Sequence, residues 1–209
     1  MANLTVLNHP LLKVKITQLR DKKTPPHDFR RVLHEVAGLM SNSVFAHLNN
    51  QSVSVETPLE VTNGWMLREP FPCLISILRA GNGLTDAFSA ILPEAPIGHL
   101  GLQRNANTHK AEAYYEKLPD RVAERQIILV DPMLATGGSA IMACNRLKDH
   151  GAHDIVFACL VAAPEGVAAL QSAHDDIPII AAASDRELNE NSYILPGLGD
   201  AGDRIYNTI

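Results

Sequence analysis

The stretch Ile127-Ile128-Leu129-Val130-Asp131-Pro132-Met133-Leu134-Ala135-Thr136-Gly137-Gly138-Ser139 decides the fold of this 209-residue chain. Its first four residues form an apolar run without polar alternation, which is typical of a strand buried on both faces of a parallel sheet. An acid ends the run, a loop with two glycines follows, and a helical pattern leads from Ser139 to a stop at Gly151. The stretch therefore predicts a strand, a loop and a helix.

The loop between this strand and this helix has the properties of an anion-binding turn. A helix N-terminus offers unpaired backbone N–H groups and the positive end of the helix dipole, and glycines allow an oxyanion to approach closely. The sequence contains no G-x-x-x-x-G-K-[ST] nucleotide loop. Gly81-Asn82-Gly83 comes closest to the G-x-G-x-x-G loop, but Asp86 stands where its third glycine should be. An ordinary βα turn stays open as an alternative, although the acid at the strand end favours a phosphate site.

Apolar runs alternate with helical patterns along the rest of the chain. They predict strands at 72–78, 97–102, 155–161 and 177–181, and helices at 29–44, at 84–92 and from Pro164. Residues 8–12 are expected to be extended, and 53–61 to form short edge strands. The apolar stripe of 29–44 would pack on the core or on another subunit. This order predicts right-handed βαβ units, and hence an α/β fold with a central, mainly parallel sheet flanked by helices and an N-terminal helical segment.

Charged residues follow several of these strands. Arg79 comes directly after the strand at 72–78, and Arg104 follows the strand at 97–102. Because loops at the carboxyl ends of parallel strands line the ligand crevice, we expect Arg79 and Asp131 on one rim. The polar excursion at 105–112 predicts a flexible hood or β-hairpin.

The tail from Asn189 to Arg204 is rich in glycine and acids, and its composition indicates a segment unable to sustain a helix or a strand. It could be a cluster of surface turns. It could equally be a binding loop in which small residues let peptide groups meet the edge of a planar ligand.

Composition narrows the class of protein. With 46% hydrophobic and 20% charged residues, 209 residues are enough for one domain, 1–209, with a sizeable core. A formal net charge of −5 argues against a nucleic-acid partner. Residues 1–15 do not read as a signal peptide, and no run approaches the roughly 20 apolar residues of a membrane helix, so we expect a cytoplasmic protein without a membrane partner. Cys73, Cys144 and Cys159 are expected to be buried free thiols rather than a disulfide or metal site.

Two long motifs resemble one family. D-P-M-L-A-T-G-G-S at 131–139 resembles the phosphoribosyl-diphosphate (PRPP) loop of type I phosphoribosyltransferases, in the form found in uracil phosphoribosyltransferases. A single acid after Val130, where most of the wider class has two, is the uracil-specific variant. Y-I-L-P-G-L-G-D-A-G-D-R at 193–204 resembles the uracil-binding loop of the same family, and the similarity covers nearly the whole chain, from His9-Pro10 onward.

The resemblance implies a type I phosphoribosyltransferase fold and transfer of the 5-phosphoribosyl group from PRPP to N1 of uracil, giving UMP and diphosphate. It implies PRPP contacts from Arg79, Arg104, Asp131, Pro132, Met133, Leu134, Ala135, Thr136, Gly137, Gly138, Ser139 and Asp200. It implies uracil contacts from Tyr193, Ile194, Gly199, Asp200 and Ala201. The catalytic residues would be Arg79, Asp131 and Asp200.

The resemblance also implies partners beyond the two substrates. Mg²⁺ would enter with PRPP rather than be held by the protein alone. A homo-oligomer, dimer or tetramer, is expected, and GTP is a candidate activator. Two alternatives stay open: a type I transferase for another base, and a catalytically silent regulator that senses PRPP or a nucleotide.

The chain departs from the family pattern at several positions. Ser76 stands where relatives usually have proline, Asn82 where they have an apolar residue or glycine, and Gln103 where an aromatic residue often precedes the arginine. The stretch from Ser41 to His47 lacks the usual Tyr-Glu-Ala. These departures bear on substrate affinity, subunit packing and nucleotide activation more than on the reaction.

Overall fold

The computed structural model describes residues 3–104 and 111–208. Its main sheet has the strand order β1-β10-β9-β7-β4-β5-β6, with β8 paired to β9. Neighbouring strands are parallel except for the antiparallel β5–β6 pair. The strands of this sheet are β1 (Leu4–Val6), β4 (Cys73–Leu78), β5 (Ile97–Arg104), β6 (Ala111–Lys117), β7 (Ile127–Val130), β8 (Met133–Leu134), β9 (Ile155–Ala162) and β10 (Ile179–Ser184). This arrangement confirms the expected central, mainly parallel sheet.

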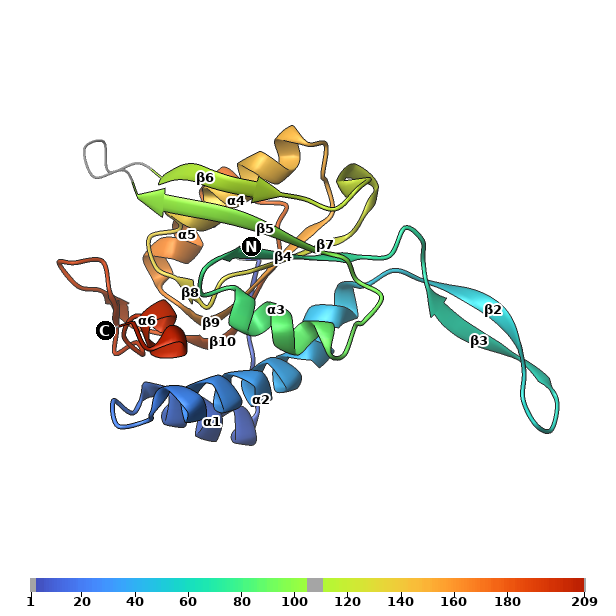
Figure 1. The fold of residues 1–209 in the computed structure, drawn as a ribbon, viewed down its shortest axis with the longest axis horizontal. Coiled ribbons are helices and arrows are strands. Elements are labelled where there is room, and N and C mark those ends of the chain that lie inside the picture. The colour runs from blue at the N-terminus through green and yellow to red at the C-terminus, as the bar shows by residue number, and fades with distance from the viewer. Residues whose placement is uncertain (1–2, 105–110, 209) are drawn as a thin grey trace.

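Helices cover both faces of the sheet (Figure 1). They are α1 (Pro10–Arg20), α2 (Pro26–Val44), α3 (Asn82–Ser89), α4 (Gly138–Asp149), α5 (Pro164–Ala173) and α6 (Ala201–Tyr206), with 3₁₀ turns at Phe45–His47 and Val122–Glu124. Helices α4 and α5 lie on one face, and α1, α2 and α3 lie on the other.

The unbroken apolar runs of the central strands contribute side chains to two hydrophobic cores, one on each face of the sheet. In β7, Ile128 and Val130 face the core formed with α1, α2, α3 and α6, whereas Ile127 and Leu129 face the core formed with α4 and α5. Successive residues of a strand point to opposite faces, so a strand covered on both faces needs apolar residues at every position. The apolar run was therefore a sound signal for a central strand.

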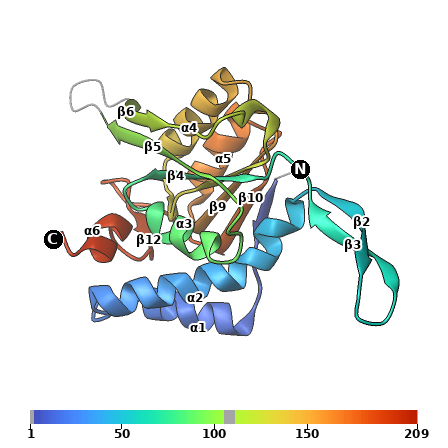
Figure 2. The same ribbon diagram turned by 45° about the vertical axis from the view of Figure 1, so that its right-hand side comes forward.

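A long hairpin stands apart from this body. Strands β2 (Asn50–Glu56) and β3 (Val61–Leu67) pair only with each other and project from the main sheet as an arm (Figures 1 and 2). Strands do form around residues 53–61, but they do not lie at an edge of the main sheet as predicted. They form an independent two-stranded ribbon. Alternating polar and apolar residues predict a strand, but they do not tell which sheet the strand joins.

Two other predictions were wrong. Residues 8–12 are not extended, because α1 begins at Pro10, a residue whose fixed φ suits the first helical position, and buries Leu12, Ile16 and Leu19 along one face. The tail does form regular structure: β12 (Ile194–Leu195) pairs with β11 (Glu187–Leu188), and α6 follows. The side chain of Asp200 caps α6 by accepting a hydrogen bond from the Asp203 backbone N–H over 2.9 Å.

The expectations for the cysteines and for the β-hairpin agree with the structure. The three cysteines are buried free thiols. Strands β5 and β6 form the expected hairpin, but residues 105–110 of the expected hood lie outside the described part of the chain. No helix among the described residues is long and apolar enough to span a membrane.

Candidate active site

The loop between β7 and α4 is built as an anion site. Gly137 adopts a positive φ of 83°, and α4 begins at the next residue. The N-cap residue Gly137 has no side chain to cap α4, and the Thr136 hydroxyl oxygen accepts only a long hydrogen bond of 3.4 Å from the Gly138 N–H. The backbone N–H groups of this turn can therefore turn to a ligand. Thr136, Gly138 and Ser139 are exposed around this turn.

Helix α5 supports the loop from below. A Cβ atom added at Gly166 would collide with the carbonyl oxygen of Ala135 and would lie 2.7 Å from that of Leu134. The helix therefore packs directly against the backbone of the loop. Pro132 and Leu134 are buried, so their side chains anchor the loop, and only their backbone groups could meet a ligand.

Asp131 lies at the end of β7 in a poorly solvated position. Burial, together with a smaller effect of the Asp200 charge, raises the pKa of its carboxyl to about 7. The Met133 backbone N–H, 3.5 Å from Oδ1 of Asp131, opposes this shift only in part. An ionised Asp131 is thus destabilised in the free protein, and a ligand that donates hydrogen bonds or brings a cation would stabilise it.

Arg79 begins the loop between β4 and α3, next to the loop that Asp131 begins. A Cβ atom added at Gly81 would lie 2.7 Å from the carbonyl oxygen of Val130, so the two loops are in direct contact. The guanidinium of Arg79 is more than half exposed and lies 3.5 Å from the Asp203 carboxylate of α6. This places Arg79 and Asp131 on one rim, as predicted.

The tail folds back over the same rim. A partly buried ion pair holds it: Arg20 of α1 makes a bidentate contact at 2.5 and 2.6 Å with Asp185, whose carboxylate is buried. The same two side chains bind both backbone groups of Gly197 at 2.7 and 2.8 Å. Gly197 and Gly199 have positive φ, which explains why the turn needs glycine there.

A cavity of about 230 Å³ joins the three segments. It is lined by Ala80, which follows Arg79, and by Met133 and Ala135 of the central loop. Seven residues of the tail complete the lining: Ser192, Tyr193, Ile194, Gly199, Asp200, Ala201 and Gly202. All five residues expected to contact the base lie in this wall. The convergence of two loops and the tail at the carboxyl ends of the strands is the arrangement that a ligand crevice requires.

The structure does not describe the side chain of one predicted site residue, and it places two residues beside Arg79 that the sequence analysis did not single out. Arg104 is the last residue of β5, and its side chain lies outside the described part of the chain. Asp203 and Tyr206 of α6 both contact Arg79. Asp203 stands three residues after the capping Asp200, a spacing that indicates the first turn of a helix, but no sequence signal pointed to Tyr206.

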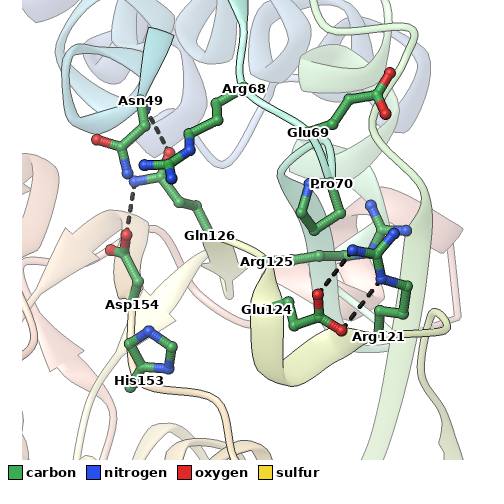
Figure 3. A pocket seen from close by; sticks show the side chains of 10 residues that line it. All are labelled: Asn49, Arg68, Glu69, Pro70, Arg121, Glu124, Arg125, Gln126, His153 and Asp154. Carbon is green, nitrogen blue, oxygen red and sulfur yellow. Dashed lines mark hydrogen bonds and ion pairs between the residues drawn. The ribbon is translucent and has the colours of Figure 1, made fainter. Parts of the chain in front are cut away.

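A larger cavity, of about 400 Å³, lies at the opposite end of the sheet (Figure 3). It is bordered by residues that come just before β4, β7 and β9, among them Gln126 and Asp154. Much of its polar lining is already paired internally: Arg121 binds Glu124 at 2.7 Å, and Gln126 binds Asp154 at 2.7 Å. We therefore place the candidate active site at the smaller cavity.

Among the described residues, no group of three or more histidine, cysteine, aspartate or glutamate side chains is placed to hold a metal ion. Asp200 lines the cavity, and Asp131 lies close enough to Asp200 for the charges of the two carboxylates to interact. This donor set suits a divalent cation that keeps waters and binds ligand phosphates, rather than a closed protein cage.

Comparison with known proteins agrees with this geometry. Residues 6–208 match the family model described as uracil phosphoribosyltransferase. The chain is 51% identical over 208 residues to a uracil phosphoribosyltransferase of Acidovorax ebreus, with all of both chains covered. It is 46% identical over 208 residues to one of Salinibacter ruber, covering 100% of this chain and 99% of the relative.

Solved structures share the fold. A protein from Aquifex aeolicus superposes with a TM-score of 0.91 at 30% identity, and 98% of each chain is covered. The adenine phosphoribosyltransferase of Trypanosoma brucei superposes with a TM-score of 0.59 at 13% identity, covering 88% of this chain and 84% of that one. These likenesses confirm the expected type I phosphoribosyltransferase fold.

Proposed function

Because the chain belongs to the uracil phosphoribosyltransferase family, we propose a role in its reaction for each group of the site. The enzyme transfers the 5-phosphoribosyl group from PRPP to N1 of uracil, giving UMP and diphosphate in pyrimidine salvage. The full-length match to uracil-specific relatives argues against another base as substrate and against a silent sensor. The observation that carries the proposal is the single cavity shared by the central loop, the Arg79 loop and the tail.

PRPP lies along the rim of the cavity in this proposal. Thr136 to Ser139 hold the 5′-phosphate at the start of α4, and Asp131 accepts hydrogen bonds from the ribose hydroxyls. Arg79 and Arg104 bind the diphosphate, and Asp200 makes a second contact with PRPP. The exposure of Thr136, Gly138 and Ser139 and the weakly capped first turn of α4 support the phosphate site.

The chemistry needs two charges to be stabilised. Positive charge develops on the ribose as the bond to diphosphate breaks, and negative charge grows on the leaving group. Asp131 and Asp200 favour the first charge, and Arg79 favours the second. Mg²⁺, when bound with PRPP, neutralises diphosphate oxygens and helps this group to leave. The position of Asp200 in the cavity wall, its interaction with Asp131 and the exposed guanidinium of Arg79 support this assignment.

Uracil enters beside the tail. Ile194, Gly199 and Ala201 present backbone groups to the base, and Tyr193 borders it. A cytosine amino group would bring a hydrogen-bond donor toward a backbone N–H that expects a carbonyl, leaving both groups unpaired. We therefore expect cytosine to be rejected.

The hairpin arm supports a homo-oligomer, dimer or tetramer. Leu59, Val61 and Trp65 are 95%, 66% and 73% exposed on the arm. An isolated two-stranded ribbon is marginally stable in water, and large exposed apolar side chains mark contact surfaces. Light scattering on the wild type and on a Leu59→Ser, Trp65→Ser variant tests this part, because a variant with an unchanged mass would contradict it.

Three further parts of the proposal rest on family likeness and composition. Residues 1–209 act as one domain, the protein is cytoplasmic, and GTP activates it. Activity measured with and without GTP tests the last point, and an unchanged rate over the GTP range found in cells would remove it.

The deciding experiment incubates the protein with Mg²⁺, PRPP and a panel of free bases. We expect UMP and diphosphate to form with uracil, and no nucleotide to form with cytosine, orotate or purines. Turnover of another base without turnover of uracil would overturn the proposed function. Binding of PRPP or UMP without any turnover would favour the silent sensor.

A further inference from the structure

The backbone of Arg79 is held by a residue outside the motifs. The Tyr206 hydroxyl donates a hydrogen bond to the Arg79 carbonyl oxygen over 2.9 Å, and the Arg79 guanidinium lies 5.7 Å from the centre of the Tyr206 ring. Tyr206 ends α6, whose first residues line the cavity. One short helix therefore touches both the base side and the diphosphate side of the site.

Ser76 and Asn82, two departures from the family pattern, form a further hydrogen bond behind this contact. The buried Ser76 donates a hydrogen bond to Oδ1 of Asn82 over 2.8 Å. The Asn82 side chain in turn lies close enough to the Tyr206 hydroxyl to lower its pKa, although burial raises that pKa more. The hydrogen-bonded pair of Ser76 and Asn82 thus lies beside the pair of Tyr206 and the Arg79 carbonyl, behind the loop that carries the guanidinium.

The surrounding packing leaves the loop little freedom. A Cβ atom at Gly81 would lie 2.6 to 2.7 Å from Ser76 Oγ and two backbone carbonyls. A Cβ atom at Gly202 of α6 would lie 3.8 Å from the Ala80 side chain and 3.9 Å from the Arg79 guanidinium. The loop is fixed between the end of β7 and α6, and Arg30 of α2 holds α6 in place by binding the Ile205 carbonyl at 2.7 Å.

We propose that Tyr206 is a positioning residue that holds Arg79 for the diphosphate group of PRPP, with Ser76 and Asn82 fixing the direction of its hydroxyl. The hydroxyl acts on the backbone at the point where the Arg79 side chain leaves the loop. Its loss leaves the guanidinium present but free to sample more directions, so binding of diphosphate weakens. This inference rests on the proposed role of Arg79.

The test compares how each variant binds the two products of the reaction, diphosphate and UMP. Tyr206→Phe removes the hydroxyl and keeps the ring, and Ser76→Ala breaks the inner hydrogen bond. Calorimetry measures the Kd of Mg²⁺ diphosphate and, separately, of UMP, which lacks the diphosphate. We expect Tyr206→Phe to weaken diphosphate binding about 3- to 10-fold, the size of one neutral hydrogen bond, and UMP binding less than about 2-fold. Ser76→Ala should shift the diphosphate Kd in the same direction by a smaller factor.

Tyr115→Phe is the matched control, because it removes a hydroxyl from an exposed tyrosine of β6 and should leave both affinities unchanged. Equal losses of diphosphate and UMP binding in Tyr206→Phe would indicate a general structural role and overturn the inference. An unchanged diphosphate Kd would also overturn it.

A double-mutant cycle tests whether Tyr206 acts through Arg79. The measured quantity is kcat/KM for PRPP, which can be determined even when binding is weak. In an Arg79→Ala background, we expect Tyr206→Phe to have no further effect. A full additional loss would show that Tyr206 acts independently and would overturn the inference. If Arg79→Ala alone leaves diphosphate binding unchanged, the proposed role of Arg79 fails instead, whatever Tyr206 does.

Discussion

The charge of Asp200, a residue of the cavity wall, helps burial to hold the pKa of Asp131 at about 7. Asp131 ends a central strand, whereas Asp200 caps a helix 69 residues later in the chain. The fold therefore brings two like charges toward one site, which disfavours their joint ionisation until a ligand arrives.

Asp131 should make stability depend on pH in the ligand-free enzyme. Because its folded pKa is raised from 3.8 to about 7, the folded state binds a proton that the unfolded state has lost between these values. The free energy of unfolding should fall as pH rises through this window, by up to about 4 kcal/mol. Asp131→Asn should remove that fall and be more stable than the wild type at pH 8, but not at pH 4. Urea denaturation across pH 4 to 8 measures this, and parallel curves for the two proteins would contradict it.

Removing the charge of either proposed catalytic group should slow turnover. Arg79→Ala loses a partner of the leaving diphosphate, and Asp131→Asn loses a partner of the ribose. We expect kcat to fall by roughly 10²- to 10³-fold in each case. Arg68→Ala, an exposed arginine at the opposite end of the sheet, is the matched control and should retain wild-type kcat. Near-wild-type kcat in either site variant would remove that residue from its role.

Gly166 should be required for the geometry of the phosphate loop. Gly166→Ala drives a methyl group into the carbonyl oxygens of Leu134 and Ala135, so the loop must shift. We expect the KM for PRPP to rise at least about tenfold, with about 1–3 kcal/mol lost in stability. The contrasting change is Gly38→Ala in α2, where a Cβ atom meets nothing within 4 Å. It should leave KM unchanged and stabilise the helix by about 0.5–1 kcal/mol.

The ion pair of Arg20 and Asp185 should hold the tail against α1. Asp185→Ala leaves the Arg20 guanidinium without its bidentate partner and frees the Gly197 N–H, which should cost about 3–5 kcal/mol. Chemical denaturation measures the loss, and the KM for uracil should rise because the tail lines the base side. Glu187→Ala, which removes an exposed pair with Arg186, should cost less than about 1 kcal/mol. Similar losses in both variants would argue against an anchoring role.

The central unit could be predicted because its signals are local. The apolar run at 127–130 marks a strand covered on both faces, and Pro164 opens α5 as its position predicts. Gly151, with a φ of 86°, follows α4 as the expected stop. Local steric preferences of this kind act over a few residues, so they can be seen without the rest of the chain.

Other features could not be predicted because distant segments decide them. The tail has the composition of a loop, yet α6 forms because Asp200 caps it and because Ala201 and Ile205 are buried against the core. The arm pairs with itself, although its sequence alone fits an edge of the main sheet. Long-range burial outweighed local propensity in the tail, whereas the mostly exposed arm is held by pairing between two strands adjacent in the sequence.

The sequence by itself determined the strand, loop and helix around Asp131, the order of the βαβ units and the motifs that identify the family. Only the tertiary structure decided that Asp200 lies near Asp131, that Arg20 anchors Gly197, and that Tyr206 holds the backbone of Arg79. The physical reason is that helix starts, stops and buried strands follow from interactions within a few residues. Contacts between residues more than 65 positions apart depend on how distant segments pack together in the folded chain.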